Sequence, residues 1–454
     1  MKKFALTFLL VGFVFTANSF AQKVLTLEEA ISIALNKNTD VIKTRNNLET
    51  NRAQVKSAYG DLLPDFGLRG SWSWTRINDD GGARIIDFFG RETTQPASRT
   101  DSRNWVLSAG GNIVLFDGLS NLANINQKTD ELEAAENLFE KLKQDIVYQT
   151  TELYYNVLNA RELVKVRQDN LKFNKKLYED IQERNKVGQV PMADVYTQQV
   201  QFGNAQLALI RAQNDYENAK SILLNFLALD VLENYRLEDP IREKQKVELD
   251  GYIKEFEDIE SMVNVALQNR KDYISKKLSL SSAREGLTVA QSGLFPSLSG
   301  NYNFSTRASS PDDLFTRREW SLGLTLNIPI FSNWNTETAI QFAKIKIDNS
   351  MEDLNALERQ IKIDIKQGYL DLVAAKKRLD VSTANVKAAE ENRKINQERY
   401  NLGSGTILDV LQSDKDYTQA LSDNINALYE YYKLRDKLLN SLGRVNPNAY
   451  EVKN

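Results

Sequence analysis

The sequence of 454 residues contains no cysteine and no histidine, and only eight prolines and 21 glycines. Without cysteine, the chain has no disulfide framework, no metal–thiolate site and no cysteine for lipid attachment. Without histidine, it lacks every Ser-His or Cys-His catalytic pair and the commonest zinc ligand. We therefore expect no catalytic site, no metal and no cofactor. Paired carboxylates are the one hydrolytic chemistry that these absences leave open.

Long apolar runs and concentrated charge are also missing. No run of 18 apolar residues follows the first 21 residues, so no transmembrane helix is expected. The 58 basic and 61 acidic residues are spread evenly, with a net charge of -3. A nucleic-acid partner requires a concentrated basic face, so none is expected. The scarcity of glycine and proline favours long helices.

The first residues have the pattern of a secretory signal. Lys2 and Lys3 are followed by an apolar run through Phe15 and by a small-x-small site that ends at Ala21. This combination predicts a signal peptide over residues 1–21.

One stretch of the sequence alternates strictly in polarity. Residues 320–331 read WSLGLTLNIPIF, with an apolar residue at every even position from 320 to 330. Side chains alternate faces along a strand, so one face is apolar and the other polar. About ten such residues, with an aromatic at each end, have the length of a strand that crosses an outer membrane. A soluble sandwich can also contain a single strand of this kind.

The same alternation recurs in the segments 66–74, 105–116 and 298–305. The four segments predict two β-hairpins of membrane type, over residues 66–116 and 298–331. A secreted chain with such strands and no membrane helix indicates the outer membrane of a Gram-negative cell.

The chain is also duplicated internally. Gly188 corresponds to Gly403, and Asp194 corresponds to Asp409. The two halves differ in length because the tip of the first hairpin, residues 77–103, is longer by roughly 17 residues than its counterpart. Each half therefore has the order helix, hairpin, long helix, tight turn, helix.

The duplication defines the expected domain organisation. We predict a first repeat over 22–229, an irregular connector over 230–257, a second repeat over 258–443 and a loose tail over 444–454. The spacing of prolines predicts three helices in each repeat, of about 38, 70 and 38 residues. Their expected ranges are 26–63, 119–187 and 191–229 in the first repeat, and 258–295, 335–402 and 406–442 in the second. Such long polar helices are stable only when they pack laterally, as in a coiled coil, and neighbouring copies supply part of that packing.

The tight turns of the two repeats share one motif. Residues 184–188 (RNKVG) are followed by Asp194, and residues 399–403 (RYNLG) are followed by Asp409. Either turn alone is a weak signal. Together with the duplication and the hairpins, they resemble the TolC-like outer-membrane efflux proteins over essentially the whole mature chain.

The resemblance implies a mainly α fold with membrane β-structure. Four strands from each protomer of a homotrimer would form one 12-stranded β-barrel on a long α-helical coiled-coil tunnel. Four strands cannot close a barrel alone, because an open edge in lipid leaves backbone groups unpaired.

The resemblance also implies an exit duct of a tripartite efflux or type I secretion system. Such a duct sits in outer-membrane lipid, has a long periplasmic extension and conducts substrates passively. Its partners are a periplasmic adaptor protein and an inner-membrane pump of the RND, ABC or MFS type. The sequence leaves open whether drugs, metals or proteins are carried. The alternative is a barrel-anchored structural or adhesive coiled-coil protein, but its anchor would lie at one end, whereas the hairpins here interrupt both halves.

In the resembling family, an acidic ring at the closed end of the tunnel selects cations. Asp409 stands at the ring position, and Gln412 replaces the second ring acid, so a weaker field is expected. The pattern Thr406-x-x-Asp409 is also a capping box at a helix start. The two interpretations are compatible.

Asp194 is the counterpart of Asp409 in the first half. In the family, this residue accepts bonds from a Tyr and an Arg that hold the entrance shut. Tyr400 occupies the Tyr position, but Gly405 occupies the Arg position, so the ionic latch is missing or rebuilt elsewhere. Tyr400 also fits a helix aromatic that simply packs on its neighbour.

The glycines of the two turns are first of all helix C-caps, because glycine readily takes the left-handed conformation that ends a helix. The resemblance adds that the exposed turns dock the adaptor. The expected docking residues are Val187, Gly188, Gln189, Leu402, Gly403 and Ser404.

Aromatic residues at the strand ends predict two interfacial girdles. The outer girdle comprises Trp72, Trp74, Trp105, Tyr302 and Trp320, and the periplasmic edge has Phe116, Phe331 and Trp334. The loop 77–103 is expected to face the exterior. Its run of Asn, Asp and Gly over 78–82 lacks the terminal bidentate acid of a calcium loop, so it does not indicate a metal.

Overall fold

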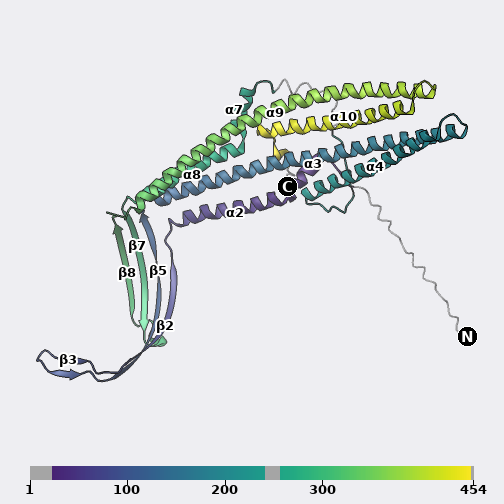
Figure 1. Cartoon of the computed structure of the whole chain (residues 1–454). Helices are drawn as coiled ribbons and strands as arrows, with labels where there is room; N and C mark the ends of the chain where they lie inside the picture. Colours follow the sequence, from purple (N-terminus) through teal and green to yellow (C-terminus); the bar gives the residue numbers. More distant parts are fainter. Residues whose placement is uncertain (1–22, 241–255, 451–454) are drawn as a thin grey trace, which may run out of the picture.

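The computed structural model describes residues 23–240 and 256–450. The predicted signal peptide and part of the predicted connector lie outside these residues. The described chain has two parts: a rod of long helices and, at one end of it, an elongated β-sheet (Figure 1).

The sheet combines the two predicted hairpins. Its strands are β2 (Gly67–Asp79), β5 (Ser98–Phe116), β7 (Ser297–Ala308) and β8 (Arg318–Asn327). They pair antiparallel in the order β2-β5-β7-β8, so β2 and β8 form the two free edges. The strand predicted to reach Phe331 ends at Asn327, because Pro329 has no backbone N–H to donate to a ladder.

The register of the sheet separates polar from apolar side chains. Trp72 lies opposite Trp105, and Tyr302 lies opposite Leu322, all on one face. Small and polar residues occupy the other face, where Asn112 pairs with Asn301. A β-bulge at Val114–Phe116 is the one irregularity in the β5–β7 ladder. The alternation predicted from the sequence is therefore present across all four strands.

The four longest helices lie close to their predicted ranges. They are α3 (Ser120–Lys186), α4 (Met192–Phe226), α9 (Asn335–Asn401) and α10 (Ile407–Ser441). α3 and α9 have 67 residues each, which corresponds to about 100 Å. Each follows a residue in the left-handed conformation, Leu119 and Trp334, so the duplication extends to the backbone where strand gives way to helix.

The first helix predicted in each repeat is wrong as a single helix. The range 26–63 contains α1 (Leu27–Lys37) and α2 (Thr39–Gly60), and the range 258–295 contains α7 (Ile259–Asn269) and α8 (Lys271–Ser292).

Asn38 and Arg270 break these helices because their backbones are extended, with ψ of 134° and 117°. Asn38 accepts a bond from the N–H of Asp40 and donates its side-chain amide to the carbonyl of Phe226 at 3.1 Å. Buried Arg270 pairs with Asp364, at 3.2 Å. Both breaks are thus held by residues distant in sequence.

A small strand pair lies against α3 near the middle of the rod. β1 (Lys23–Leu25) pairs in parallel with β6 (Tyr235–Leu237), so the described part of the connector is partly ordered in a sheet. The Tyr154 hydroxyl lies 2.8 Å from the carbonyl oxygen of Leu25, and Arg161 donates to the carbonyl of Leu237 at 2.7 Å.

The prediction of a loose tail from residue 444 is wrong up to residue 450. Pro447 is buried at the start of a 3-10 helix, η2 (Pro447–Ala449). Gln144 on α3 donates to the carbonyl of Val445 at 3.0 Å, and Tyr450 packs against the hydrophobic core. The tail is therefore part of the central packing.

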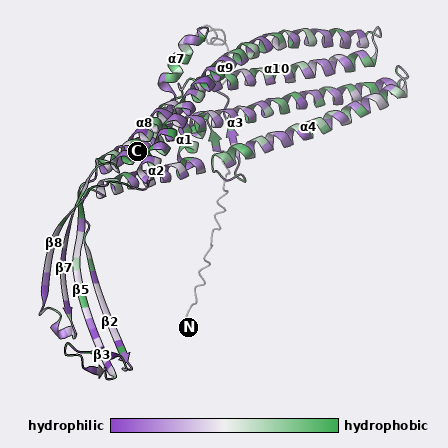
Figure 2. Cartoon of the chain, turned by 60° about the vertical axis from the view of Figure 1, so that its left-hand side comes forward, coloured by the Kyte–Doolittle hydropathy of each residue, from purple (hydrophilic) through white to green (hydrophobic). Residues whose placement is uncertain are grey.

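The helices bury apolar side chains in two separate clusters. A large cluster surrounds the middle of the rod, and a small one lies at the end far from the sheet. Along the long helices, hydrophilic and hydrophobic residues are interspersed (Figure 2). In the part of the chain that the structure describes, no helix is long and apolar enough to cross a membrane.

The helices follow the same lateral order as the strands. α2 and α4 pack on one side of α3, α8 and α10 pack on its other side, and α9 packs beyond α8 and α10. One edge of the chain is therefore formed by β2, α2 and α4, and the opposite edge by β8 and α9.

Candidate functional site

The two tight turns lie together at the end of the rod far from the sheet (Figure 1). Gly188 and Gly403 have φ of 74° and 75°, the left-handed conformation that favours glycine. The N–H of Gln189 bonds to the carbonyl of Arg184, and the N–H of Ser404 bonds to that of Arg399, both at 2.9 Å. These bonds close a helix C-cap in each half, as the sequence predicts.

Each turn also exposes an apolar side chain. Val187 is 69% exposed and Leu402 is 83% exposed. No residue that the structure describes covers these side chains, so the predicted docking residues are accessible at the turns between α3 and α4 and between α9 and α10.

Asp409 lies in the first turn of α10 and forms the predicted capping box with Thr406. Its carboxylate accepts from the N–H of Thr406 at 2.9 Å and from the Thr406 hydroxyl at 2.8 Å, while its own N–H lies 3.3 Å from that hydroxyl. These bonds hold the pKa of Asp409 below its usual range. Asp409 is nevertheless exposed, as is Gln412, whose amide donates to Asp416 at 2.8 Å.

Tyr400 is buried in the small apolar cluster at the tip, with Val195 and Val410. Its hydroxyl has no hydrogen-bond partner among the residues that the structure describes. Desolvation and then the charge of Asp194 raise the pKa of Tyr400, against the opposing effect of Arg184. Asp194 therefore lies near enough to act on Tyr400, but the expected bond between them is not formed within the single chain.

Arg184 is the arginine that stands beside this pair. Its guanidinium carbon lies 5.4 Å from the centre of the Tyr400 ring, and it donates to the Asn401 amide oxygen at 3.2 Å. Gly405, at the position where the family has the arginine, has no side chain that could contact Tyr400 or Asp194. The arginine that lies over the ring of Tyr400 therefore comes from the first half of the chain.

A polar hollow of about 730 Å³ lies between α4 and α10, above α3. Asp409, Gln412 and Asp414 line it from α10. Asp414 is buried in the hollow's wall and was not identified from the sequence. A signal was available, because Asp414 follows Ile407 by seven residues and Val410 by four, which places a carboxylate in an apolar heptad stripe.

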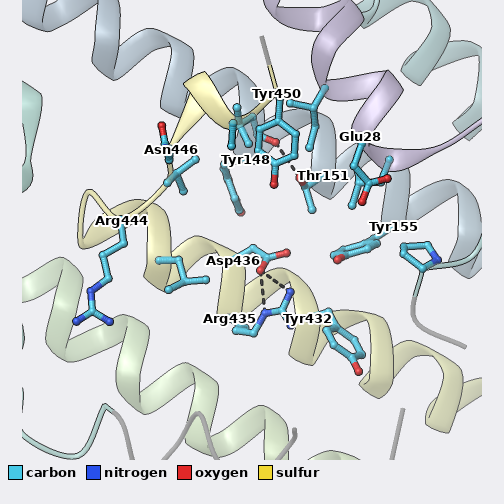
Figure 3. A pocket seen from close by; sticks show the side chains of 17 residues that line it. Glu28, Tyr148, Thr151, Tyr155, Tyr432, Arg435, Asp436, Arg444, Asn446 and Tyr450 are labelled. Atoms are coloured by element: carbon cyan, nitrogen blue, oxygen red, sulfur yellow. Dashed lines mark hydrogen bonds and ion pairs between the residues drawn. The ribbon is translucent and has the colours of Figure 1, made fainter. Parts of the chain in front are cut away.

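A second hollow, of about 400 Å³, lies near the middle of the rod (Figure 3). Tyrosines from α3, α10 and the C-terminal segment surround it: Tyr148, Tyr155, Tyr432 and Tyr450. Arg435 and Asp436 form an ion pair of 2.7 Å at its wall, and burial raises the pKa of Asp436. None of the residues predicted for a site lines this hollow.

The predicted aromatic girdle is partly assembled in the sheet. Trp72 and Trp105 lie opposite each other with ring centres 6.0 Å apart, and Trp74 follows on the same face. Trp320 packs on Phe304 at 4.7 Å, a partner that the sequence did not identify. At the helical end, Phe116 pairs with Leu298, and Phe331 and Trp334 meet edge to face at 6.0 Å.

Tyr302 does not lie level with Trp72 and Trp105, whereas Trp320, which pairs with Phe304, lies near the level of Tyr302. Trp105 pairs with Ala308, so Tyr302 lies six residues nearer the helices along β7. Its hydroxyl donates to the carbonyl oxygen of Asp65.

The long loop of the first hairpin begins later than predicted. β2 and β5 remain paired up to Asp79 and Ser98, beyond which β3 (Arg84–Ile86) and β4 (Glu92–Thr94) form a second small hairpin. At its tip the two phenylalanines 88 and 89 are almost fully exposed.

Comparison with known proteins identifies the class of this fold. The Campylobacter jejuni CmeC outer membrane channel superposes with a TM-score of 0.74 at 18% identity, over 92% of this chain and 85% of that chain. The fold is therefore that of an outer-membrane channel.

The family follows from the sequence match. The family model described as "Outer membrane efflux protein" matches residues 30–228 and 262–444, so the chain belongs to this family. Outer membrane protein TolC of Escherichia coli K12 is 20% identical over 87% of this chain and 77% of that protein. Outer membrane protein TolC of Vibrio cholerae O1 is 22% identical over 69% of this chain and 70% of that protein.

The family membership decides between the alternatives that the sequence left open. The protein is an outer-membrane efflux channel of the TolC family, whose members are non-enzymatic channels of tripartite efflux systems. The adhesive coiled coil and hydrolysis by paired carboxylates are set aside.

Proposed function

We propose that three copies of this chain close into a continuous duct that conducts substrates passively from the periplasm to the exterior. The observation that carries the proposal is the common lateral order of strands and helices. Because β2, α2 and α4 form one edge and β8 and α9 the other, the same head-to-tail contact closes both the sheet and the helical rod.

Both helical edges carry unpartnered apolar side chains. α4 exposes more than half of Val200, Leu207 and Ile210, and α9 does the same with Ile363 and Leu370. Their spacing places them along the edge of each helix. Apolar stripes of this kind on long helices are stable when a second stripe covers them.

The sheet has the same requirement. Its edge strands β2 and β8 leave unpaired backbone groups, which lipid cannot satisfy. Three four-stranded sheets make a closed barrel of 12 strands, with the tryptophan face toward lipid and the polar face toward the lumen.

The tips form the gate in this proposal. Three copies of Asp409 make an acidic ring that selects cations, with Gln412 contributing a dipole but no charge. Asp194 and the Tyr400 hydroxyl, which has no partner within the described chain, hold the entrance closed. Arg184 supplies the guanidinium group that the family has at the position of Gly405. The orphaned hydroxyl supports this assignment, since buried polar groups in stable assemblies find partners.

The turns dock a periplasmic adaptor, which links the duct to an inner-membrane pump of the RND, ABC or MFS type. The exposed apolar side chains of Val187 and Leu402 support a contact there, beside Gly188, Gln189, Gly403 and Ser404. Drugs, metals and proteins all remain candidate substrates.

Planar-bilayer recording from the purified protein tests the duct. We expect discrete, cation-selective conductance steps, and their absence in well-inserted protein would contradict the proposal. Because the chain has no cysteine of its own, single cysteines at Gln189 and Ser404 test the docking tips. They should crosslink to the adaptor in cells that carry the pump, whereas a cysteine at exposed Glu352, far along α9, should not.

A further inference from the structure

The two helical hairpins, α3–α4 and α9–α10, share apolar clusters and are also joined by a series of hydrogen bonds. α3 of the first hairpin and α10 of the second run side by side, and hydrogen bonds connect them at intervals. Asn440 donates to Asp145 at 2.8 Å, and Asn159 donates to Asn426 at 3.0 Å. Toward the tip, Asn170 on α3 reaches both Asp414 and Thr418 on α10.

The last of these contacts lies where the apolar packing is interrupted. α10 packs Ile407 and Val410 into the tip cluster, and from Tyr429 onward its buried residues belong to the central cluster. Between these clusters the buried residues of α10 are all polar: Ser413, Asp414, Thr418 and Ser422. Hydrogen bonds and charge therefore hold this segment, without much help from apolar burial.

Asp414 connects three helices in this segment. One carboxylate oxygen accepts from the amides of Asn170 at 2.8 Å and Asn174 at 3.2 Å, both on α3. The other lies 3.1 Å from Nε of Arg393 on α9. Arg393 is itself held between the rings of Phe173 and Tyr417, at 4.1 and 4.9 Å. Gln198 on α4 extends the network by donating to Asn174 at 3.2 Å.

We propose that Asp414, with Arg393, Asn170 and Asn174, is an internal latch that keeps the two helical hairpins together and so keeps the tip closed. This inference rests on the proposed duct and adds a control point behind the acidic ring. Opening the tip requires one hairpin to move relative to the other. Such a movement breaks the hydrogen bonds from Asn170 and Asn174 to Asp414, whereas the Asp414–Arg393 pair lies within the second hairpin. Buried polar groups that lose their hydrogen-bond partners are costly, so the cluster resists small displacements whether Asp414 is ionised or protonated.

The hollow beside Asp414 gives the latch a way to respond to pH. Burial raises the pKa of Asp414 to about 6, against the opposing effects of Arg393, Asn174 and Asn170. The charged residues on the same hollow are Arg167 from α3 and Asp409 and Lys415 from α10, whereas the α4 residues that line it are uncharged.

The direction of the pH response follows from the linkage between protonation of Asp414 and opening of the tip. When the hairpins part, Asp414 meets water and its pKa falls toward the ordinary value of 3.8. Protonation therefore favours the closed arrangement, in which the pKa is higher. The stabilisation of the closed tip is present at acid pH and is lost as pH rises through about 6. We expect the opening equilibrium of each protomer to be about tenfold smaller at pH 5 than at pH 7.5.

Single-channel recording of the full-length trimer tests the latch. Asp414→Ala removes the acceptor of two amides and should raise the open probability several-fold at pH 7. Asp414→Asn keeps an acceptor but cannot titrate, so it should flatten the pH dependence. The control Asp423→Asn makes the same chemical change at an exposed position farther along α10 and should behave as the wild type. The latch is wrong if both Asp414 variants match this control.

A cysteine pair tests the latch independently if the Asp414→Ala variant does not fold. The Asn170 amide lies 3.1 Å from the Thr418 hydroxyl, so Asn170→Cys with Thr418→Cys tethers α3 to α10 at the latch. The oxidised protein, confirmed by gel mobility, should stay closed until dithiothreitol is added. An oxidised channel that opens like the wild type would overturn the proposal.

A distance measurement separates failure of the latch from failure of the duct. Spin labels at Gln189 and Ser404, in labelled chains diluted with unlabelled ones, report the separation of the two tips of one chain without any conductance. We expect a broader and longer distance distribution at pH 7.5 than at pH 5, and at both pH values in Asp414→Ala. Unchanged distances would reject the latch, whereas absent conductance with changing distances would reject the duct alone.

Discussion

α3 and α9 are equivalent helices of the two repeats, yet they are buried to different extents. Both have 67 residues, but seventeen are buried in α3 and only seven in α9. α3 lies in the middle of the chain, between α2 and α4 on one side and α8 and α10 on the other, whereas α9 forms an edge. The difference comes from position in the chain's own packing, and in the proposed trimer the open side of α9 is covered by a neighbouring copy.

The largest loss of stability should come from a substitution on the buried side of α9. Ile365 is fully buried, and Ile365→Ala should lower the free energy of unfolding by about 2–5 kcal/mol through the cavity it leaves. Thermal unfolding followed by circular dichroism measures it. The loss should be the same at all protein concentrations, because this residue packs within one chain. A loss that vanishes at high concentration would place Ile365 at a subunit contact.

The open side of α9 should respond differently. Ile363 is 55% exposed, so Ile363→Glu should leave the helical content of the chain nearly unchanged but weaken its association. Light scattering on dilution measures the trimer's dissociation. Lys362→Gln, at an exposed position about 100° around α9 from Ile363, serves as the control. Equal association of both variants would show that this side of α9 does not face a neighbour.

At the end of the rod far from the sheet, the two halves each contribute one residue to the proposed gate. Tyr400→Phe removes a hydroxyl that has no partner within the described chain, so it should change the stability of the single chain little. Combined with Asp194→Ala, it should raise the closed-state conductance of the trimer if these residues hold the gate. Unchanged single-channel conductance would contradict the gate.

The smallest effect concerns charge selectivity at the start of α10. Asp409→Asn should lower the preference for cations over anions at pH 7, and Gln412→Asp should raise it. Because bonds from Thr406 lower the pKa of Asp409, the wild-type selectivity should persist to a more acid pH than an ordinary aspartate would allow. Reversal potentials in asymmetric salt measure both effects. Selectivity that fades between pH 7 and 5 would assign it to another group.

The sequence predicted the elements whose ends are marked locally. Proline and glycine end the long helices, and strict alternation identifies the strands, so α3, α9 and the two-faced sheet were all foreseen. The breaks at Asn38 and Arg270 were missed because Phe226 and Asp364, far away in the sequence, hold them.

The site was predicted less completely for the same reason. The caps at Gly403 and Asp409 depend on neighbours in sequence and were found, whereas Arg184 beside Tyr400 joins two different halves. Asp414 draws its partners from α3 and α9, so only its place in an apolar stripe could have revealed it.

The central claim is that three copies close the open edges of this chain into one duct. Negative-stain electron microscopy of the detergent-extracted protein tests it most directly. We expect particles with threefold symmetry, each with a rod of about 100 Å on a short barrel. Monomers, or fibres without a central channel, would contradict the account.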